Sequence, residues 1–193
     1  EEFDTKSDIA ERYKELQTDL YNDLFDEFKY DLQSWDAEID SSLTIRFKEP
    51  DVLFDAGRSD IQPAFQEILN NFFPRYIRVL QREQYIDHIN EIRIEGHTSI
   101  EGRSGMSEDE SYFYNMELSQ DRTRSVLATC LYSLDRNVFN WTKNRATANG
   151  LSSVKPIESN ATQYGRQQNR RVEFKVKTDA EAQIREMLRY ARN

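Results

Sequence analysis

The stretch Tyr114-Asn115-Met116-Glu117-Leu118-Ser119-Gln120-Asp121-Arg122 predicts the start of a helix, in which Leu118, Val126 and Leu127 recur at helical spacing. The first turn of a helix has unpaired backbone N–H groups and a partial positive charge, and both favour a carboxylate. Arg122 would add a planar guanidinium that can hold a carboxylate by two hydrogen bonds. The stretch therefore predicts an anion-binding corner, although an ion pair between Arg122 and a neighbouring acid on a solvated helix explains the same residues.

On both sides of this stretch, the hydrophobic pattern predicts strands alternating with helices. Alternating patterns predict strands over 42–48, 91–97 and 171–176, and a short strand over 146–151. Helical patterns cover 61–80, with Pro63 in the first turn and Pro74 expected to kink or interrupt the helix, and 116–134. The segment 137–143 is ambiguous, and 98–111 and 152–168 are expected to be loops. Two strand-helix-strand crossings in one mixed sheet predict an α/β (α+β) sandwich with the helices on one face.

The first forty residues predict a long acidic helix. Apolar residues are spaced by three or four from Ile9 to Ile39 and form one stripe, and neither Pro nor Gly interrupts them. This stripe must be covered, either by the domain that follows or by the same helix of a second copy. We therefore divide the chain into an acidic helical linker (1–41) that dimerises or plugs, a folded domain (42–177), and a C-terminal amphipathic helix (178–193).

The charge distribution argues against nucleic acid as a partner. Residues 1–42 hold fourteen Asp and Glu against four Lys and Arg, whereas the net charge of the whole chain is −9. Phosphate binding needs a basic face, which a nearly neutral domain with an acidic segment lacks. Cys130 lies among apolar residues and is expected to be a buried thiol. No apolar run approaches the ~20 residues that span a bilayer, so we expect any membrane attachment through a segment before Glu1.

Four motifs occur in an order that is similar to one known family. They are Phe54-Asp55-Ala56-Gly57; Glu95-Gly96-His97-Thr98; Tyr114-Asn115-x-x-Leu118-Ser119-x-x-Arg122; and Ser159-Asn160-x-Thr162-x-x-Gly165-Arg166-x-x-Asn169-Arg170-Arg171-Val172-Glu173. Together they resemble the OmpA-like peptidoglycan-binding domain over residues 42–177. The acidic helix before the domain resembles the periplasmic region of MotB-like stator subunits, and the 98–114 insertion is most similar to the wall-anchoring subunits of Zorya anti-phage defence.

The resemblance implies a function and a set of partners. It implies a periplasmic domain of a single-pass inner-membrane protein that holds an ion-driven motor or channel complex to the cell wall. The implied partners are the diaminopimelate-containing stem peptide of peptidoglycan, a second copy of the chain, and a membrane channel subunit of the ZorA or MotA type. An alternative is an assembly domain of such a complex in which wall binding is weakened or lost.

The resemblance also implies the residues of the binding site. Arg122 would take a carboxylate of diaminopimelate, and Asn115 and Leu118 would shape the pocket. Tyr114, Thr98, Ser99, Asp55 and Arg170 complete the expected set. Arg170 would belong to a basic lip of the site, whereas the alternative for Tyr114 is an aromatic that covers the sheet edge, and the alternative for Thr98, Ser99 and Asp55 is a role as turn residues. Arg171 is expected to form a structural pair, and His97 is expected to be a satisfied structural histidine.

Ser99 departs from the pattern of the family. An Asp usually stands there and takes the ammonium group of the ligand, whereas a hydroxyl offers no Coulombic attraction. Either an acid of the inserted loop substitutes for it (Glu101, Glu108, Asp109 or Glu110), or affinity falls, or the preference within the stem peptide shifts.

No arrangement of residues predicts an enzyme. Two histidines and one cysteine, none at metal spacing, argue against a zinc site. The chain has neither a Gly-rich phosphate loop nor a Gly-x-Ser-x-Gly motif. We therefore expect binding without catalysis, and neither a cofactor nor a metal.

Overall fold

The computed structural model describes residues 2–48 and 53–179, with side chains from residue 10 onward. The elements are α1 (Glu2–Phe28), β1 (Ala37–Asp40), β2 (Thr44–Phe47), α3 (Pro63–Leu80), the short 3₁₀ helix η1 (Ile86–His88), β3 (Ile89–His97), α4 (Glu108–Tyr132), α5 (Arg136–Lys143), β4 (Ala146–Gly150), α6 (Gln163–Asn169) and β5 (Arg171–Thr178). The expected C-terminal helix over 178–193 lies almost entirely outside the described residues.

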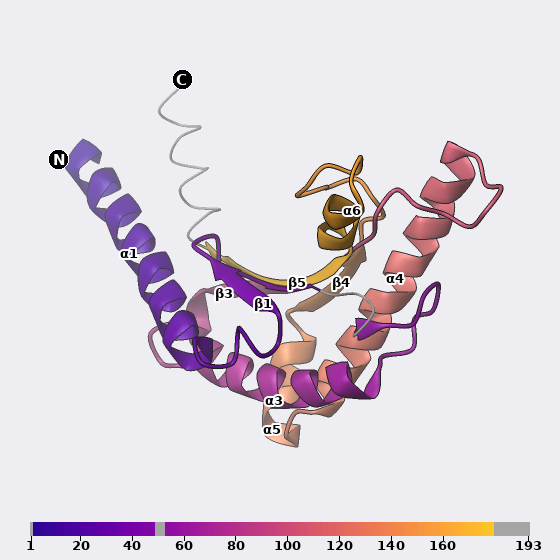
Figure 1. Cartoon of the computed structure of the whole chain (residues 1–193). Helices are drawn as coiled ribbons and strands as arrows, with labels where there is room; N and C mark the ends of the chain where they lie inside the picture. The colour runs from indigo at the N-terminus through magenta and orange to yellow at the C-terminus, as the bar shows by residue number, and fades with distance from the viewer. Residues whose placement is uncertain (1, 49–52, 180–193) are drawn as a thin grey trace.

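One five-stranded mixed sheet forms the centre of the fold, with the strand order β1-β2-β5-β3-β4 (Figure 1). β3 pairs with β5 in an antiparallel register, in which Ile94 lies opposite Phe174 and Glu95 opposite Glu173. β4 adds to the other side of β3 in parallel. The predicted α/β sandwich, with two strand-helix-strand crossings, is confirmed.

The helices α3, α4 and α5 lie together on one side of the sheet (Figure 1). The core between these layers is rich in aromatic rings: Phe72 of α3 lies 5.0 Å from Phe174 of β5 and 5.1 Å from Phe47 of β2, measured between ring centroids. α3 begins at Pro63, two residues after the predicted start, with this proline in its first turn as expected, and it continues through Pro74 without the expected interruption.

α1 is shorter than predicted. It ends at Phe28, and residues 37–40 of the expected helix instead form the edge strand β1, which pairs with β2. Residues of the apolar stripe are fully buried within this chain: Leu20, Leu24 and Phe28 have no exposed surface, and Phe28 contacts Phe72 of α3. The sequence left two ways to cover the apolar stripe, by the domain that follows or by the same helix of a second copy. In the structure, the protein's own domain covers this half of the stripe.

α4 begins two turns earlier than predicted. Ser107 caps its N-terminus by accepting a hydrogen bond from the backbone N–H of Glu110, whose side chain accepts from the backbone N–H of Ser107. Asn115 and Arg122 therefore lie inside the helix, so the prediction that their stretch starts it was wrong. The unpaired N–H groups of a first turn are not available beside Arg122.

Three further segments can be compared with the structure predicted for them from the sequence. The ambiguous segment 137–143 lies in the helix α5, and β4 matches the predicted short strand. The expected loop over 152–168 contains the helix α6, which Thr162 caps by accepting a hydrogen bond from Gly165. Within residues 2–48 and 53–179, no helix is both long and apolar enough to cross a bilayer.

Candidate functional site

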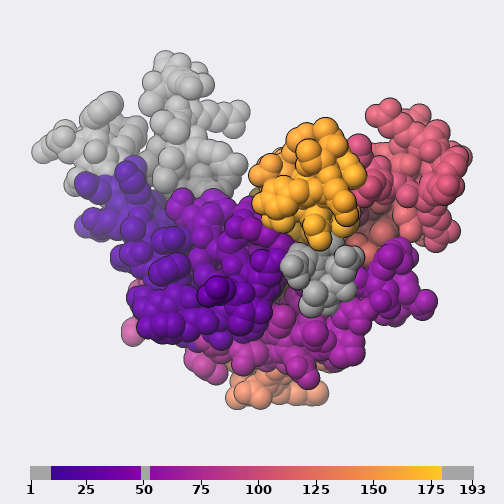
Figure 2. All heavy atoms as spheres, in the orientation of Figure 1, coloured from indigo at the N-terminus to yellow at the C-terminus, as the bar shows by residue number. Residues whose placement is uncertain are grey.

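A pocket of about 1040 Å³ lies where two loops meet one face of α4. The first loop, 54–60, contributes Phe54 and the residues from Ala56 to Asp60, and the second, 98–103, follows β3. α4 contributes side chains that recur at helical spacing, namely Tyr114, Asn115, Glu117, Leu118, Asp121 and Arg122. Figure 2 shows the surface hollowed between the yellow segment that contains α6 and the pink segment that leads into α4.

Arg122 joins α4 to the first loop. Its Nε donates to the carbonyl oxygen of Arg58 (2.8 Å), and its Nη2 donates to that of Asp55 (3.2 Å). The guanidinium lies over the ring of Phe54, with 4.8 Å between Cζ and the ring centroid, and the residue is only 8% exposed. A cation held in a partly dry pocket wall acts more strongly on an anion than one in water. Arg122 thus both shapes the loop and places positive charge at the pocket.

Asn115 fixes the second loop. Its Nδ2 donates to the carbonyl oxygens of Ser99 (3.1 Å) and Glu101 (3.0 Å). Gly102 lies so close to α4 that a Cβ there would be 2.3 Å from Oγ of Ser111, so this position leaves no room for a side chain. α4 therefore sets the position of the loop.

Glu101 lies at the centre of an ion-pair cluster at this wall of the pocket. Its carboxylate accepts from Arg166 Nε of α6 (2.8 Å), from Arg170 Nη1 (3.2 Å) and from Ser99 Oγ (3.2 Å). Glu101 is thus the acid of the inserted loop that lies beside Ser99. Its carboxylate is, however, already shared by two guanidinium groups.

Thr98 provides a buried polar atom with unused bonding capacity. The residue lines the pocket and is 5% exposed. Its backbone N–H donates to the carbonyl of Ser152, but its Oγ1 has no hydrogen-bond partner among the described residues. Since leaving a buried hydroxyl unpaired costs free energy, such an atom at a pocket wall suggests a partner that arrives with a ligand.

The lining of the pocket carries both signs of charge in equal number. Four arginines (Arg58, Arg103, Arg122 and Arg170) and four acids (Asp60, Glu101, Glu117 and Asp121) contribute to it. Tyr114 spans the two loops, because the cation of Arg103 lies 4.8 Å from its ring centroid and a Cβ on Gly57 would be 2.8 Å from its hydroxyl. This composition suits a ligand that itself carries carboxylates and amine or amide groups.

Seven of the eight residues expected at the site line the pocket: Arg122, Asn115, Leu118, Tyr114, Ser99, Thr98 and Arg170. Asp55 does not line it; its carbonyl oxygen accepts from Arg122 and its carboxylate accepts from Gln62. The sequence did not single out Arg58, Arg103 or Asp121 as site residues. Their arginine and acid side chains at loop and helix positions carried no spacing signal, since the fold alone brings them together.

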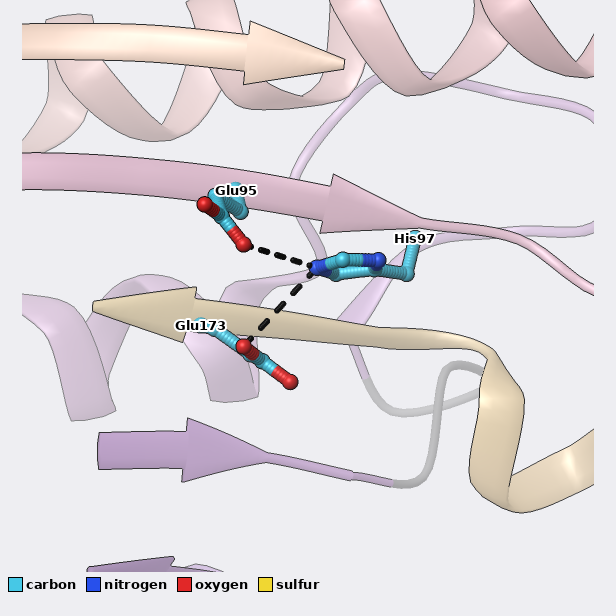
Figure 3. A group of neighbouring side chains, drawn as sticks. All are labelled: Glu95, His97 and Glu173. Carbon is cyan, nitrogen blue, oxygen red and sulfur yellow. Dashed lines mark hydrogen bonds and ion pairs between the residues drawn. The ribbon is translucent and has the colours of Figure 1, made fainter. Parts of the chain in front are cut away.

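A second polar cluster lies on the sheet and joins Glu95 and His97 of β3 to Glu173 of β5 (Figure 3). His97 Nε2 lies 3.2 Å from Glu95 and 3.8 Å from Glu173. Burial raises the pKa of Glu95, but hydrogen bonds from His97 and Lys175 outweigh it and lower the pKa to about 2. Burial likewise raises the pKa of Glu173, but Arg171 and Arg46 outweigh this effect and lower the pKa to about 2. Both carboxylates are therefore ionised.

This cluster is an ion-pair network rather than a place for a metal. The ligand atoms of Glu95, His97 and Glu173 lie within 4.8 Å of one another, close enough for one cation. Lys175 Nζ, however, already lies 2.7 Å from Glu95 and 3.1 Å from Glu173. Arg171 is buried and pairs with Glu173, which is the structural role expected of it.

His97 is only half satisfied. Because a carboxylate can only accept, its Nε2 carries the proton toward Glu95, and Nδ1 is left as an acceptor without a partner among the described residues. Burial lowers the pKa of His97, which keeps the ring neutral. His97 was expected to be a satisfied structural histidine, and this expectation is met for Nε2 but not for Nδ1.

Comparison with known proteins identifies the family. Residues 53–170 match the OmpA family. The chain is 45% identical over 185 residues to the Zorya protein ZorB of Escherichia coli, a match that covers 94% of this chain and 77% of that protein. It is 31% identical over 126 residues to outer membrane protein A of Bordetella avium, covering 65% of this chain and 54% of that protein.

Solved structures show the same fold. A putative MotB-like protein from Desulfovibrio vulgaris superimposes with a TM-score of 0.64 at 24% identity, over 88% of this chain and 98% of that one. The cell wall anchor of the type VI secretion system from Pseudomonas aeruginosa gives a TM-score of 0.56 at 22% identity, over 80% and 96% of the two chains. The resemblance read from the four motifs is confirmed. The chain belongs to the OmpA family, and within it to the family of the Zorya protein ZorB.

Proposed function

We propose that this protein is a periplasmic anchor that holds an inner-membrane, ion-driven channel complex of anti-phage defence to the cell wall by non-covalent binding of the peptidoglycan stem peptide. The kinship to ZorB supports the complex and its cellular role. The kinship to the OmpA family supports the ligand. The proposed partners are a second copy of the chain and a channel subunit of the ZorA or MotA type, with membrane attachment through a segment outside this sequence.

The pocket beside Arg122 is the observation that carries the proposal. In a stem peptide, diaminopimelate keeps a free carboxylate and a free amine at the end of its side chain, so this end is zwitterionic. The pocket presents matching groups: Arg122 and Arg170 for a carboxylate, the acids and hydroxyls of the lining for the amine or for an amide formed from it, and the hydroxyl of Thr98, which has no hydrogen-bond partner among the described residues, for a further hydrogen bond. Charge complementarity of this kind favours specific binding of a polar ligand.

Binding without catalysis is part of the proposal. The cationic side chains that line the pocket are guanidinium groups, which hold anions but do not exchange protons near neutral pH. Anchoring also needs no reaction, since it requires only that the bound wall resist lateral movement of the complex.

A sacculus co-sedimentation assay tests the proposal. The whole chain is incubated with purified diaminopimelate-type sacculi and compared with Arg122→Ala and Arg124→Ala. Arg124 is the matched control, because it lies on the same helix with a side chain that is 79% exposed and lies outside the pocket lining. We expect wild type and Arg124→Ala to sediment with the wall and Arg122→Ala to remain in the supernatant.

Two results would count against the proposal, the first against wall binding itself and the second against this pocket as its site. If none of the three proteins sediments, the alternative of an assembly domain without wall binding is favoured. If Arg122→Ala sediments as well as wild type, wall binding persists but does not use this pocket. Circular dichroism of Arg122→Ala checks that the loss of binding does not arise from unfolding, since Arg122 also holds the 54–60 loop.

A further inference from the structure

The wall of the pocket formed by Ser99 and Glu101 carries a surplus of positive charge. Ser99 is neutral, and the single negative charge of Glu101 lies against the guanidinium groups of Arg166 (2.8 Å) and Arg170 (3.2 Å). An ammonium group that approaches this wall must either displace a guanidinium from Glu101 or remain beside two cations. Both cost free energy, because like charges repel and an ion pair is broken.

The other acids of the pocket compensate little for this surplus. Asp60 lies 3.4 Å from Arg58, and Asp121 lies 3.1 Å from Arg124. Glu117, which is exposed on α4, is the lining acid without an ion pair within the described part of the chain. It is therefore the rival site for an ammonium group.

A neutral amide fits the same wall without any charge penalty. The hydroxyl of Ser99 donates its proton to Glu101, so the lone pairs of Oγ can accept an amide N–H. The hydroxyl of the neighbouring Thr98, which has no hydrogen-bond partner within the described part of the chain, can donate to an amide carbonyl. The volume of about 1040 Å³ lies slightly above the range of about 300–1,000 Å³ for pockets that hold a drug-sized ligand, so the pocket has room for more than one amino-acid residue.

We infer that the pocket prefers cross-linked stem peptides, in which the side-chain amine of diaminopimelate is acylated by the neighbouring stem, over stems in which this amine is free. The inference rests on the proposed function and narrows its ligand class. Acylation converts the ammonium into a neutral amide, with one donor and one acceptor. Ser99 and Glu101, with the two arginines that neutralise Glu101, are then the residues that determine specificity.

Isothermal titration of the whole chain with two matched ligands tests the inference. One ligand is a disaccharide-tetrapeptide with a free diaminopimelate amine, and the other is the same molecule acetylated on that amine, so that they differ chiefly in charge. We expect the acetylated ligand to bind wild type at least about threefold more tightly. Ser99→Asp should reverse the preference, because it adds a carboxylate for the ammonium. Glu101→Gln should increase the preference, because it leaves both arginines uncompensated.

Glu117→Gln serves as the control for the rival acid and should leave the preference unchanged. Equal affinities, or tighter binding of the free amine by wild type, would overturn the inference while leaving the proposed function intact. Loss of a free-amine preference in Glu117→Gln would then assign the ammonium to Glu117. An absence of binding with both ligands at millimolar concentration would contradict the proposed function together with the inference that rests on it.

Discussion

The side-chain nitrogen of Asn115 on α4 lies 3.1 Å from the carbonyl oxygen of Ser99 and donates a hydrogen bond to it. The same nitrogen donates to the carbonyl of Glu101, so both N–H bonds of one amide group are used by one loop. Asn115 is 2% exposed, and water therefore cannot easily take its place. A helix residue thus determines where the pocket wall stands.

Replacing this amide by a carboxylate should release the loop. Asn115→Asp places a negative charge beside two carbonyl oxygens, and we expect it to lower the free energy of unfolding by about 1–3 kcal/mol and to weaken sacculus binding. Urea denaturation measures the first effect and co-sedimentation the second. Asn137→Asp, the same substitution at an exposed position of α5, should change neither. An unchanged stability of Asn115→Asp would show that the two hydrogen bonds do not hold the loop.

Arg75 should be the main polar attachment of α1 to α3. Its Nε donates to the carboxylate of Glu27 (2.7 Å), its Nη2 donates to Asp31 (2.9 Å), and its guanidinium lies 4.9 Å from the ring centroid of Phe28. We expect Arg75→Ala to cost about 1–2 kcal/mol and to speed amide hydrogen exchange in the second half of α1.

The neighbouring arginine provides the control for that experiment. Arg78 lies on the same helix, is exposed, and forms no ion pair within residues 2–48 and 53–179. In Arg78→Ala, the amide hydrogens in the second half of α1 should exchange at the wild-type rate. If the two variants exchange alike, the apolar contacts of α1 suffice and the Arg75 cluster adds nothing measurable.

Low pH should destabilise the fold through the cluster of Glu95, His97 and Glu173 on the sheet. The pKa values of Glu95 and Glu173 are about 2 in the folded protein and 4.5 for the free groups, so the stability they contribute is complete above pH 4.5 and is lost as the pH falls toward 2. The pKa of His97 is also lowered from 6.5, which adds a loss in the same direction below pH 6.5. The free energy of unfolding should therefore fall between pH 6.5 and 2. Urea denaturation at several pH values measures it.

A variant that removes one titrating group checks the origin of this pH dependence. Glu95→Gln cannot lose a proton-linked ion pair at position 95, so its stability should fall less steeply below pH 4.5 than that of wild type. An identical slope would assign the acid sensitivity to other carboxylates.

Gly96 should tolerate no side chain, because α4 lies directly on β3 at this position. A Cβ there would be 2.7 Å from Cγ2 of Thr123 and 2.9 Å from the carbonyl oxygen of Ser119. We expect Gly96→Ala to lower the unfolding free energy by about 1–3 kcal/mol, as overpacking does. Gly105→Asn is the comparison: among the described residues, no atom beyond its chain neighbours lies within 4 Å of its Cβ position, and Asn tolerates its φ of +87° better than most other residues. A stable Gly96→Ala would mean that α4 can shift away from the sheet.

Local signals in the sequence were sufficient to predict the elements at the centre of the fold. Alternation at Ile92 and Ile94 predicted β3, and Pro63 marked the first residue of α3, because both features are properties of a short segment. The N-terminus of α4 was not predicted correctly, although Ser107 and Glu110 have the spacing of a capping box. The exposed Tyr112 and Phe113 disturb the helical spacing of apolar residues in its first turns, which hid the signal.

The end of α1 depended on contacts distant in sequence. Trp35 and Ile39 continue the apolar spacing of the helix, but residues 37–40 instead pair with β2, where Glu38 forms an ion pair with Arg46. For the candidate site, the motif residues could be predicted from the resemblance. The neutralisation of Glu101 by Arg166 could not, because it joins residues 65 positions apart through the packing of α6.

Nuclear magnetic resonance titration of the ¹⁵N-labelled chain with a diaminopimelate-containing muropeptide tests the central claim most directly. If the stem peptide binds beside Arg122, the amide signals of residues 54–60, 98–103 and 114–122 should shift in a saturable manner, while those of α1 and β1 stay in place. Absence of any saturable shift in these three segments at millimolar muropeptide would contradict the account.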